Sequence, residues 1–414
     1  MTDPDAAGAA RALERCDVLA SLTSLQGGLE RVSFSEEHRA ANALVGEWMR
    51  EAGLRVRQDA AGNICGRLEG QRAGLPALVL GSHLDTVTDA GRYDGMLGVL
   101  LAIEVADRLD AAALPFALEL IGFTDEEGTR FGNALFGSRA FAGRVGDAWL
   151  ATPDRTGTTV AQAMTGFGLD PARIGDAARP PDDLVGYLET HIEQGPHLLD
   201  ADRALGVVTA IAGARRFALQ VTGRAGHAGG TPYARRRDAV VAAAEIVLEI
   251  ERISIESRTI GTVGRIRAFP GGVNVVPGAC RFSLDLRAET DEARDTAFDR
   301  IDAFAREVCA RRGVTWSWDE FYRADATTCD PGLVAAVEAG VRSTGDADPM
   351  RVWSRAGHDG MAVSDVTGVA MLFLRCGNDG ISHHPDETVT AADTAAALAA
   401  FSATVHAVAE QHRA

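Results

Sequence analysis

The chain has 414 residues, with 41 basic and 58 acidic side chains and a formal net charge of −17. All 41 basic residues are arginine, which excludes mechanisms that need a catalytic lysine, such as Schiff-base chemistry, lysine-held pyridoxal phosphate and Walker-A phosphate loops. The acidic balance argues against nucleic acid or an anionic membrane as a partner, because binders of polyanions usually carry a basic patch.

The cysteines and the N-terminal segment bear on where the protein works. The six cysteines are scattered and form no C-x-x-C pair, which is typical of reduced, buried thiols. The N-terminal segment lacks the basic start and apolar stretch of a secretion signal, and no membrane span is visible. We therefore expect a cytoplasmic protein.

In chain order, the first elements predict a parallel sheet. Short continuous apolar runs at 78–80 and 118–123 flank a helical stretch at 97–109. This β-α-β spacing is typical of neighbouring parallel strands that helices cover on both faces. Two further runs of the same kind lie at 184–188 and 371–374.

The pattern changes in the middle of the chain. Strict alternation of apolar and polar residues at 217–221 and 282–286 predicts half-buried antiparallel strands. Amphipathic helices are predicted around 240–250 and over 291–311.

Together these patterns predict an α/β fold in two parts. A mixed, largely parallel sheet covered by helices forms the catalytic domain, from residues 1–212 and 322–414. A two-layer α+β insertion occupies residues 213–321. Open α/β sheets bind ligands beyond the carboxyl ends of their strands, so we expect catalytic or ligand-binding residues in the segments that follow the apolar runs.

Each of the four apolar runs is followed by a segment that contains metal-ligand residue types. In chain order these are His83, Asp85, Asp94, Glu126, Glu127, His191, His383 and His384. Imidazole and carboxylate groups suit a borderline-soft divalent ion such as Zn²⁺, and two ions can share one carboxylate. A single segment of this kind is more often surface or cap chemistry, but four at one sheet edge favour a two-metal hydrolase.

Spacing within two segments suggests roles. Residues two apart on an extended chain point the same way, so we expect the Asp85 carboxylate to hold the second ring nitrogen of His83. The neighbours Glu126 and Glu127 cannot both face one ion from a strand. One of them can bind metal while the other stays free as a base.

Three alternative functions fit the sequence less well. A Ser-His-Asp hydrolase would show a G-x-S-x-G elbow, and a dinucleotide-binding fold would show G-x-G-x-x-G between a strand and a helix; neither is found. A non-catalytic scaffold would show a broken ligand set, and this set is intact.

A series of motifs runs from about residue 30 to residue 400: GSHLDTV, GRYDGMLG, TDEEGTRFGNALFGS, ETHIEQGP, AGHAGGTP, RRRDA, PGGVNVVPG and GISHHP. Together they resemble the hydantoinase/carbamoylase amidases, a branch of the dinuclear zinc aminoacylase and carboxypeptidase superfamily. That branch includes N-carbamoyl-L-amino acid hydrolases, β-ureidopropionases and allantoate amidohydrolases.

The resemblance implies a cofactor of two divalent ions, Zn²⁺ or Mn²⁺, with Co²⁺ also suited to the ligand set. It implies that His83, Asp94 and His191 hold one ion. Asp94 would bridge to a second ion held by Glu127 and His383, since the family motif places the ligand directly after the serine rather than at His384. Glu126 would be the general base, with Asp85 as its catalytic companion.

The resemblance also implies that the insertion is a lid that forms a homodimer and carries substrate contacts on His227, Asn274 and Arg287. Arg287 suits a substrate carboxylate through its bidentate fork, although an ordinary solvated strand residue is the alternative. Gln194 is expected either to bind the ureido group or to serve a turn. Gly357 is expected near the substrate.

Two segments depart from the family pattern. HAGGTPY, with Gly230 and Tyr233, stands where relatives usually have HAGT-x-PM, and SRAGHDG, with Arg355 and Gly360, stands where they have SGAGHDA. Both departures leave the metal ligands intact. They are compatible with a smaller or more acidic substrate than is usual.

The implied reaction is hydrolysis of a carbamoyl C–N bond in a small ureido carboxylate. The segment Arg375-Cys376-Gly377 before GISHHP looks most like bacterial allantoate amidohydrolases, which yield ureidoglycine, ammonia and carbon dioxide. An N-carbamoyl-L-amino acid hydrolase or a β-ureidopropionase is the alternative. An aminoacylase-like hydrolase is more distant.

Overall fold

The computed structural model describes residues 4–413, which fold into two compact units. The first unit comprises Met1–Thr209, Cys329–Val352 and Ala356–Ala414, and the second comprises Ala210–Thr328 with Trp353–Arg355. The second unit therefore contains the predicted insertion and extends beyond it at both ends.

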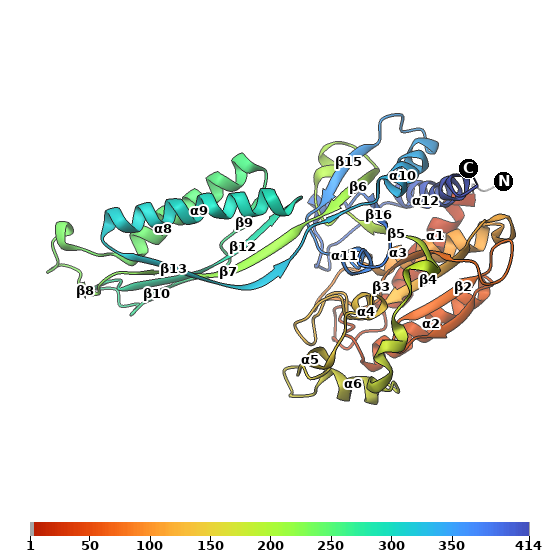
Figure 1. Cartoon of the computed structure of the whole chain (residues 1–414), viewed down its shortest axis with the longest axis horizontal. Helices are drawn as coiled ribbons and strands as arrows, with labels where there is room; N and C mark the ends of the chain where they lie inside the picture. The colour runs from red at the N-terminus through yellow and green to blue at the C-terminus, as the bar shows by residue number, and fades with distance from the viewer. Residues whose placement is uncertain (1–3, 414) are drawn as a thin grey trace. The chain divides into compact units, whose positions relative to one another are not determined.

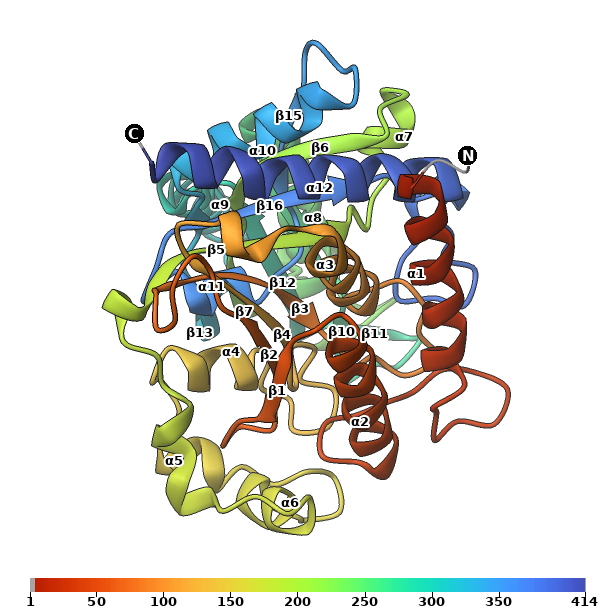
Figure 2. The same ribbon diagram turned by 90° about the vertical axis from the view of Figure 1, so that its right-hand side faces the viewer.

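The first unit is built on a sheet in which the strands β1-β2-β4-β3-β5-β16-β6 are neighbours in that order and β15 also pairs with β6 (Figures 1 and 2). Its centre is four parallel strands: β4 (Ala117–Phe123), β3 (Ala77–His83), β5 (Leu184–Ile192) and β16 (Val369–Leu374). Every residue of β3, β4 and β16 is buried, which explains their apolar runs. The run in β4 is interrupted by the buried Glu119, which pairs with Arg57 at 2.9 Å and with Arg179 at 2.8 Å. The predicted mixed, largely parallel sheet is confirmed.

Antiparallel strands flank this centre: β1 (Arg55–Gln58), β2 (Ile64–Leu68), β6 (Leu205–Ile211) and β15 (Met350–Ser354). The short strand β14 (Thr327–Thr328) belongs to the second unit. Helices cover both faces of the central strands. The helices α3 (Met96–Arg108), α10 (Pro331–Ser343) and α12 (Ala391–Gln411) pack on one face. On the other, Val79 of β3 packs with Phe141 of α4 (Phe136–Phe141) and Val363 of α11 (Gly360–Val363).

The remaining helices of this unit are α1 (Pro4–Ala20), α2 (Glu36–Glu51), α5 (Asp147–Leu150), α6 (Val160–Gly166) and α7 (His197–Asp200), with 3-10 turns at Ala111–Ala113, Pro171–Ala177, Pro181–Asp183 and Asn378–Gly380. α1 packs on α3 and α12. α12 is long and apolar enough to cross a membrane, but half of that stretch is buried inside the protein, as in a core helix. All six cysteines are free and buried.

The second unit is a two-layer α+β structure. Its antiparallel sheet has the order β10-β12-β7-β13, and β9 also pairs with β12. The strands are β7 (Gly213–Thr222), β9 (Ile260–Thr262), β10 (Ile266–Phe269), β12 (Ala279–Ala288) and β13 (Thr315–Ala324). The helices α8 (Ala239–Ser257) and α9 (Asp291–Arg312) cover one face, where Phe217 and Phe282 join the core (Figure 1).

A short second sheet stands at one end of this unit. It pairs β8 (Gly226–His227) with β11 (Val275–Val276), and the turn Tyr233–Arg235 follows. Asp238 then caps α8 by accepting hydrogen bonds from the backbone N–H groups of Val240 and Val241. The run of three arginines before Asp238 thus leads into a helix start.

Candidate metal centre

The predicted ligands meet at the carboxyl edge of the parallel strands in the first unit. His83 and His191 lie at the ends of β3 and β5, and Glu126 and Glu127 follow β4. Asp94 lies in the loop before α3, and His383 in the loop after β16. The structure therefore brings all six of these side chains to one place, from five separate segments of the chain.

Asp94 lies at the centre of the cluster, with each carboxylate oxygen facing a different group. Its Oδ1 is 3.2 Å from His191 Nε2 and 3.7 Å from His83 Nε2. Its Oδ2 is 3.1 Å from His383 Nε2, which in turn is 3.4 Å from a Glu127 oxygen. One carboxylate between two ligand sets is the arrangement that a bridging ligand needs.

Backbone carbonyls orient the two buried histidines. His191 Nδ1 lies 2.9 Å from Ile192 O, and His83 Nδ1 lies 3.0 Å from Asp85 O. A carbonyl oxygen only accepts, so each Nδ1 donates its proton to it and each Nε2 is directed toward Asp94; in a neutral ring, Nε2 is then the nitrogen that could bind an ion.

The expected contact between the Asp85 carboxylate and His83 is not made, because that carboxylate lies 3.8 Å from Nδ1. The Asp85 carboxylate instead accepts hydrogen bonds from the backbone N–H groups of Glu126, at 3.0 Å, and Glu127, at 3.1 Å. Asp85 thus orients His83 through its carbonyl and fixes the Glu126-Glu127 pair through its carboxylate.

Burial and nearby charges shift the pKa values of the side chains in this cluster. Burial raises the pKa of Glu126 well above its usual range. Burial and the nearby Asp94 raise the pKa of Glu127 to about 7, and the hydrogen bond with Asp94 raises the pKa of His383 to about 9. Burial alone would raise the pKa of Asp94 too, but the surrounding histidines hold it well below its usual range.

The donor set fits two divalent ions. The groups His83-Asp94-His191 and Asp94-Glu127-His383 each bring their ligand atoms within 4.8 Å of one another. His191 Nε2 is buried and makes no hydrogen bond of standard geometry, although Asp94 Oδ1 is near. Two ligand atoms that point at one metal ion lie close together in this way without a hydrogen bond between them. Nitrogen and carboxylate ligands suit Zn²⁺ and Mn²⁺.

Glu126 belongs to neither of these two groups, although His83, Glu126 and Glu127 form a further set whose ligand atoms lie within 4.8 Å of one another. Its Oε2 lies 4.0 Å from His83 Nε2, and the side chain is buried. A buried carboxylate beside these candidate ligands, with a pKa raised by burial, is of the kind that can act as a general base.

Several residues at the site were not predicted from the sequence. Glu387 is buried and accepts hydrogen bonds from the backbone N–H groups of Tyr93 and Asp94 and from Ser382 Oγ, so it joins the loops that carry Asp94 and His383. His358 is also buried, with its ring 4.5 Å from that of His191.

Gln194, expected on the ureido group, donates from Nε2 to Asp94 Oδ2 at 2.9 Å and also lies 3.2 Å from His383 Nε2. It therefore stands beside the bridging carboxylate. His384 turns away, because its Nδ1 accepts a hydrogen bond from the backbone N–H of Asp386. Gly357 is exposed and directly precedes the buried His358.

Gly95 allows His83 to reach this position. It has φ +68°, and a Cβ there would lie 2.4 Å from the His83 ring. We expect Gly95→Ala to displace His83 and to weaken metal binding by about 10- to 100-fold, the range seen when support of a ligand is lost. Metal competition with a chelator measures this. The control Gly157→Ala changes a glycine of similar φ, +87°, that has no atom near its Cβ position; equal affinity losses in both variants would contradict the account.

The three predicted substrate residues of the insertion lie at two ends of the second unit. His227 and Asn274 are neighbours, because Ala228 N donates to Asn274 O and β8 pairs with β11. Arg287 lies near the other end of β12, where Nε and Nη2 contact Asp285 and Nη1 donates to Arg355 O.

Comparisons with known proteins agree with this geometry. Residues 79–407 match the peptidase family M20/M25/M40. The chain is 38% identical to an N-carbamoyl-L-amino-acid amidohydrolase of Pseudomonas sp. strain NS671, over 87% of this chain and 88% of that protein. It is 37% identical to a probable allantoate deiminase of Oryza sativa subsp. japonica, over 92% and 85%. A hydantoinase/carbamoylase family amidase from Burkholderia multivorans superposes with a TM-score of 0.89, at 30% identity and 97% coverage of both chains.

Proposed function

The chain belongs to peptidase family M20/M25/M40 and, within it, to the hydantoinase/carbamoylase amidases, and on this premise we propose that it hydrolyses the carbamoyl C–N bond of a small ureido carboxylate. One observation carries the proposal. Asp94 presents one oxygen to His83 and His191 and the other to His383, beside a separate buried carboxylate, Glu126.

The ions would be two Zn²⁺ or Mn²⁺ per chain, held by His83, Asp94, His191, Glu127 and His383. When bound, such ions lower the pKa of water and polarise the carbonyl that is attacked. Glu126 would take the proton of the attacking water and deliver it to the leaving nitrogen. Hydrolysis of the carbamoyl group then yields an amine, ammonia and carbon dioxide.

His227 is prepared to donate a hydrogen bond. Its Nδ1 accepts the backbone N–H of Gly230 at 2.9 Å, so the neutral ring carries its proton on Nε2. A donor fixed in this way suits the oxyanion that forms at the carbamoyl carbon. Arg236 holds the turn by donating to the backbone oxygens of Ala228 and Thr231.

Arg287 would bind the substrate carboxylate. The length of β12 decides whether His227 of the same chain can contact that substrate too. Arg287 is eight residues along β12 from Ala279, which is about 27 Å of extended strand. His227 lies beyond the Ala279 end, because Ala279 pairs with Thr222, β8 follows Thr222 along the chain, and its partner β11 precedes Ala279. One copy of this unit cannot place both side chains on one small substrate.

We therefore propose a homodimer in which His227 and Asn274 act in the active site of the second copy. An apolar stripe on α8 supports a contact between copies: Val241, Leu248 and Ile255 are seven residues apart and 42%, 68% and 73% exposed. The edge strand β10 adds Ile266, which is 57% exposed. Apolar side chains at such spacing on one helix face are typical of a helix that packs on a partner.

Subunit mixing tests the shared site. His227→Ala and Glu126→Gln chains should each be inactive alone, and refolding them together should restore up to about a quarter of the wild-type activity, since one site in the mixed dimer keeps both residues. Mass photometry checks that dimers form. A mixture that stays inactive while dimers form would show that His227 does not act across the interface.

Arg287→Gln is expected to raise KM for a ureido carboxylate by about 10- to 100-fold with a smaller change in kcat, because a charged hydrogen-bonding partner of the carboxylate is lost. Arg216→Gln is the matched control, since Arg216 shares Asp285 with Arg287. Steady-state kinetics decide the matter, and an unchanged KM in Arg287→Gln would remove it as the carboxylate clamp.

The choice between substrates depends on the active-site residues and not on the Arg375-Cys376 segment. The Arg375-Cys376 segment that looks like allantoate amidohydrolases has a structural role, because Arg375 pairs with Asp393 and Asp202, and Cys376 Sγ accepts from Gln194 N. Allantoate and N-carbamoyl-L-amino acids are both candidates, followed by N-carbamoyl-β-alanine. Ammonia release from the metal-loaded protein across these compounds tests the proposal; turnover of N-acyl amino acids alone would contradict it.

A further inference from the structure

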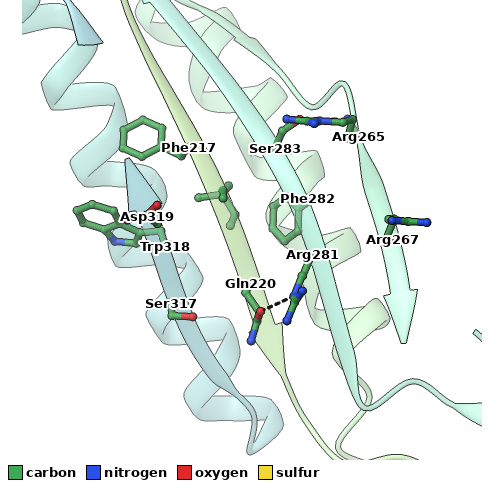
Figure 3. A pocket seen from close by; sticks show the side chains of 12 residues that line it. Phe217, Gln220, Arg265, Arg267, Arg281, Phe282, Ser283, Ser317, Trp318 and Asp319 are labelled. Atoms are coloured by element: carbon green, nitrogen blue, oxygen red, sulfur yellow. Dashed lines mark hydrogen bonds between the residues drawn. The ribbon is translucent and has the colours of Figure 1, made fainter. Parts of the chain in front are cut away.

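A pocket of about 520 Å³ opens on the sheet of the second unit, and it is separate from every residue placed in the reaction above. It lies on the face opposite α8 and α9, because Phe217 and Phe282 point to the helices while their neighbours Ala218 and Arg281 alternate to the other side (Figure 3). Its volume is within the range of small-molecule sites.

Two rows of side chains run across the four strands and line this pocket. The first row, from β10 to β13, is Arg267, Arg281, Gln220 and Ser317. The second row is Arg265, Ser283, Ala218 and Asp319. Ala218 has only a methyl group at the centre of its row, so the surrounding longer side chains leave a hollow there.

The arginines of this pocket differ from others on the same sheet. Arg216 and Arg287 share the carboxylate of Asp285. Within residues 4–413, no carboxylate lies at ion-pair distance from Arg265, Arg267 or Arg281. Arg281 Nε donates to Gln220 Oε1 at 2.7 Å, which orients its guanidinium along the first row (Figure 3).

The positive charges of Arg265, Arg267 and Arg281 lower the stability of the folded protein when no anion neutralises them. Arg267 and Arg281 stand directly opposite each other on neighbouring strands, and like charges in that position are destabilising. The acidic member of the pocket, Asp319, lies three strands from Arg265, about 14 Å away. At physiological salt that exceeds the screening length of about 8 Å, so Asp319 does not offset the three cations.

We infer that this pocket binds a small multivalent oxyanion, bearing phosphate or more than one carboxylate group, through Arg265, Arg267 and Arg281. Guanidinium groups bind such oxygens in bidentate fashion, and the hydroxyl of Ser283 and the amide of Gln220 supply further polar contacts at the same place. Three cations lie close together here, although the chain as a whole has a net charge of −17. A monoanion would neutralise one of these three charges, whereas a multivalent anion would neutralise more than one.

Calorimetric titration of the metal-loaded protein at low salt tests the inference, with inorganic phosphate and succinate as the two chemical arms and acetate as the monoanion. We expect saturable binding in at least one arm and about tenfold weaker binding of acetate. Arg267→Gln/Arg281→Gln should weaken the binding at least about tenfold. Ala218→Phe should weaken it too, by filling the hollow without changing the charge.

The matched control is Arg300→Gln/Arg311→Gln, which removes the same charge from α9 of the same unit and should change the affinity less than about twofold. Arginine modification with phenylglyoxal locates the site, since the anion should protect Arg267 and Arg281. The inference is overturned if neither phosphate nor succinate binds saturably, or if the double variant of β10 and β12 binds as tightly as the control.

Discussion

Glu126→Gln is expected to lower kcat by about 10²- to 10⁴-fold while the protein still binds its metal ions. The substitution keeps the size of the side chain and removes its ability to accept a proton. Because Glu126 lies beside the ligands without belonging to the two groups that Asp94 connects, its loss leaves both groups complete. KM should change little, since the residue proposed to bind the substrate carboxylate is Arg287.

The neighbouring residue provides the control for that experiment. Glu127→Gln changes the same side-chain type one position along the chain, but Glu127 lies 3.4 Å from His383 in the second ligand group. It should lose metal as well as activity, whereas Glu126→Gln should lose activity alone. Elemental analysis of both purified variants separates these outcomes. Near-normal turnover in Glu126→Gln would remove it as the base.

Asp94→Asn should have the largest effect on metal content. Both oxygens of Asp94 face ligand groups, so the change removes the only negative charge common to the two. We expect bound metal to fall below about one ion per chain and activity to fall to background, because a neutral amide is a poor ligand for a divalent ion.

Asp386→Asn is the matched control, since Asp386 is exposed in the same loop as His383 and contacts only the neighbouring His384 among the histidines. It should keep both its metal and its activity. If Asp94→Asn retained two tightly bound ions, Asp94 would not be the bridging ligand.

Much of this architecture could be predicted from local patterns. Mostly apolar runs marked β3, β4, β5 and β16, because strands buried on both faces have few polar positions; Glu119 of β4 is a buried exception. Parallel strands end at one edge, so the residues that follow them had to meet. The alternation around Phe217 and Phe282 identified the second sheet for the same reason, as one face is buried and the other is not.

The contacts between loops could not be predicted in this way. Glu387 reaches the backbone of Asp94 across 293 residues, and no periodicity relates the two. Gln194 and His383 both have a left-handed backbone, with φ 56° each, which turns their side chains toward Asp94. Such backbone conformations depend on tertiary packing. The contact of His83 with the Asp85 carbonyl, in place of the expected contact with the Asp85 carboxylate, depends on tertiary packing in the same way.

Metal titration tests the central claim most directly. Protein stripped with a chelator is titrated with Zn²⁺ or Mn²⁺ while ammonia release from its best ureido carboxylate is followed. We expect no activity without metal, then a rise that levels off at two bound ions per chain. Full activity in the stripped protein, or a plateau at one ion, would contradict it.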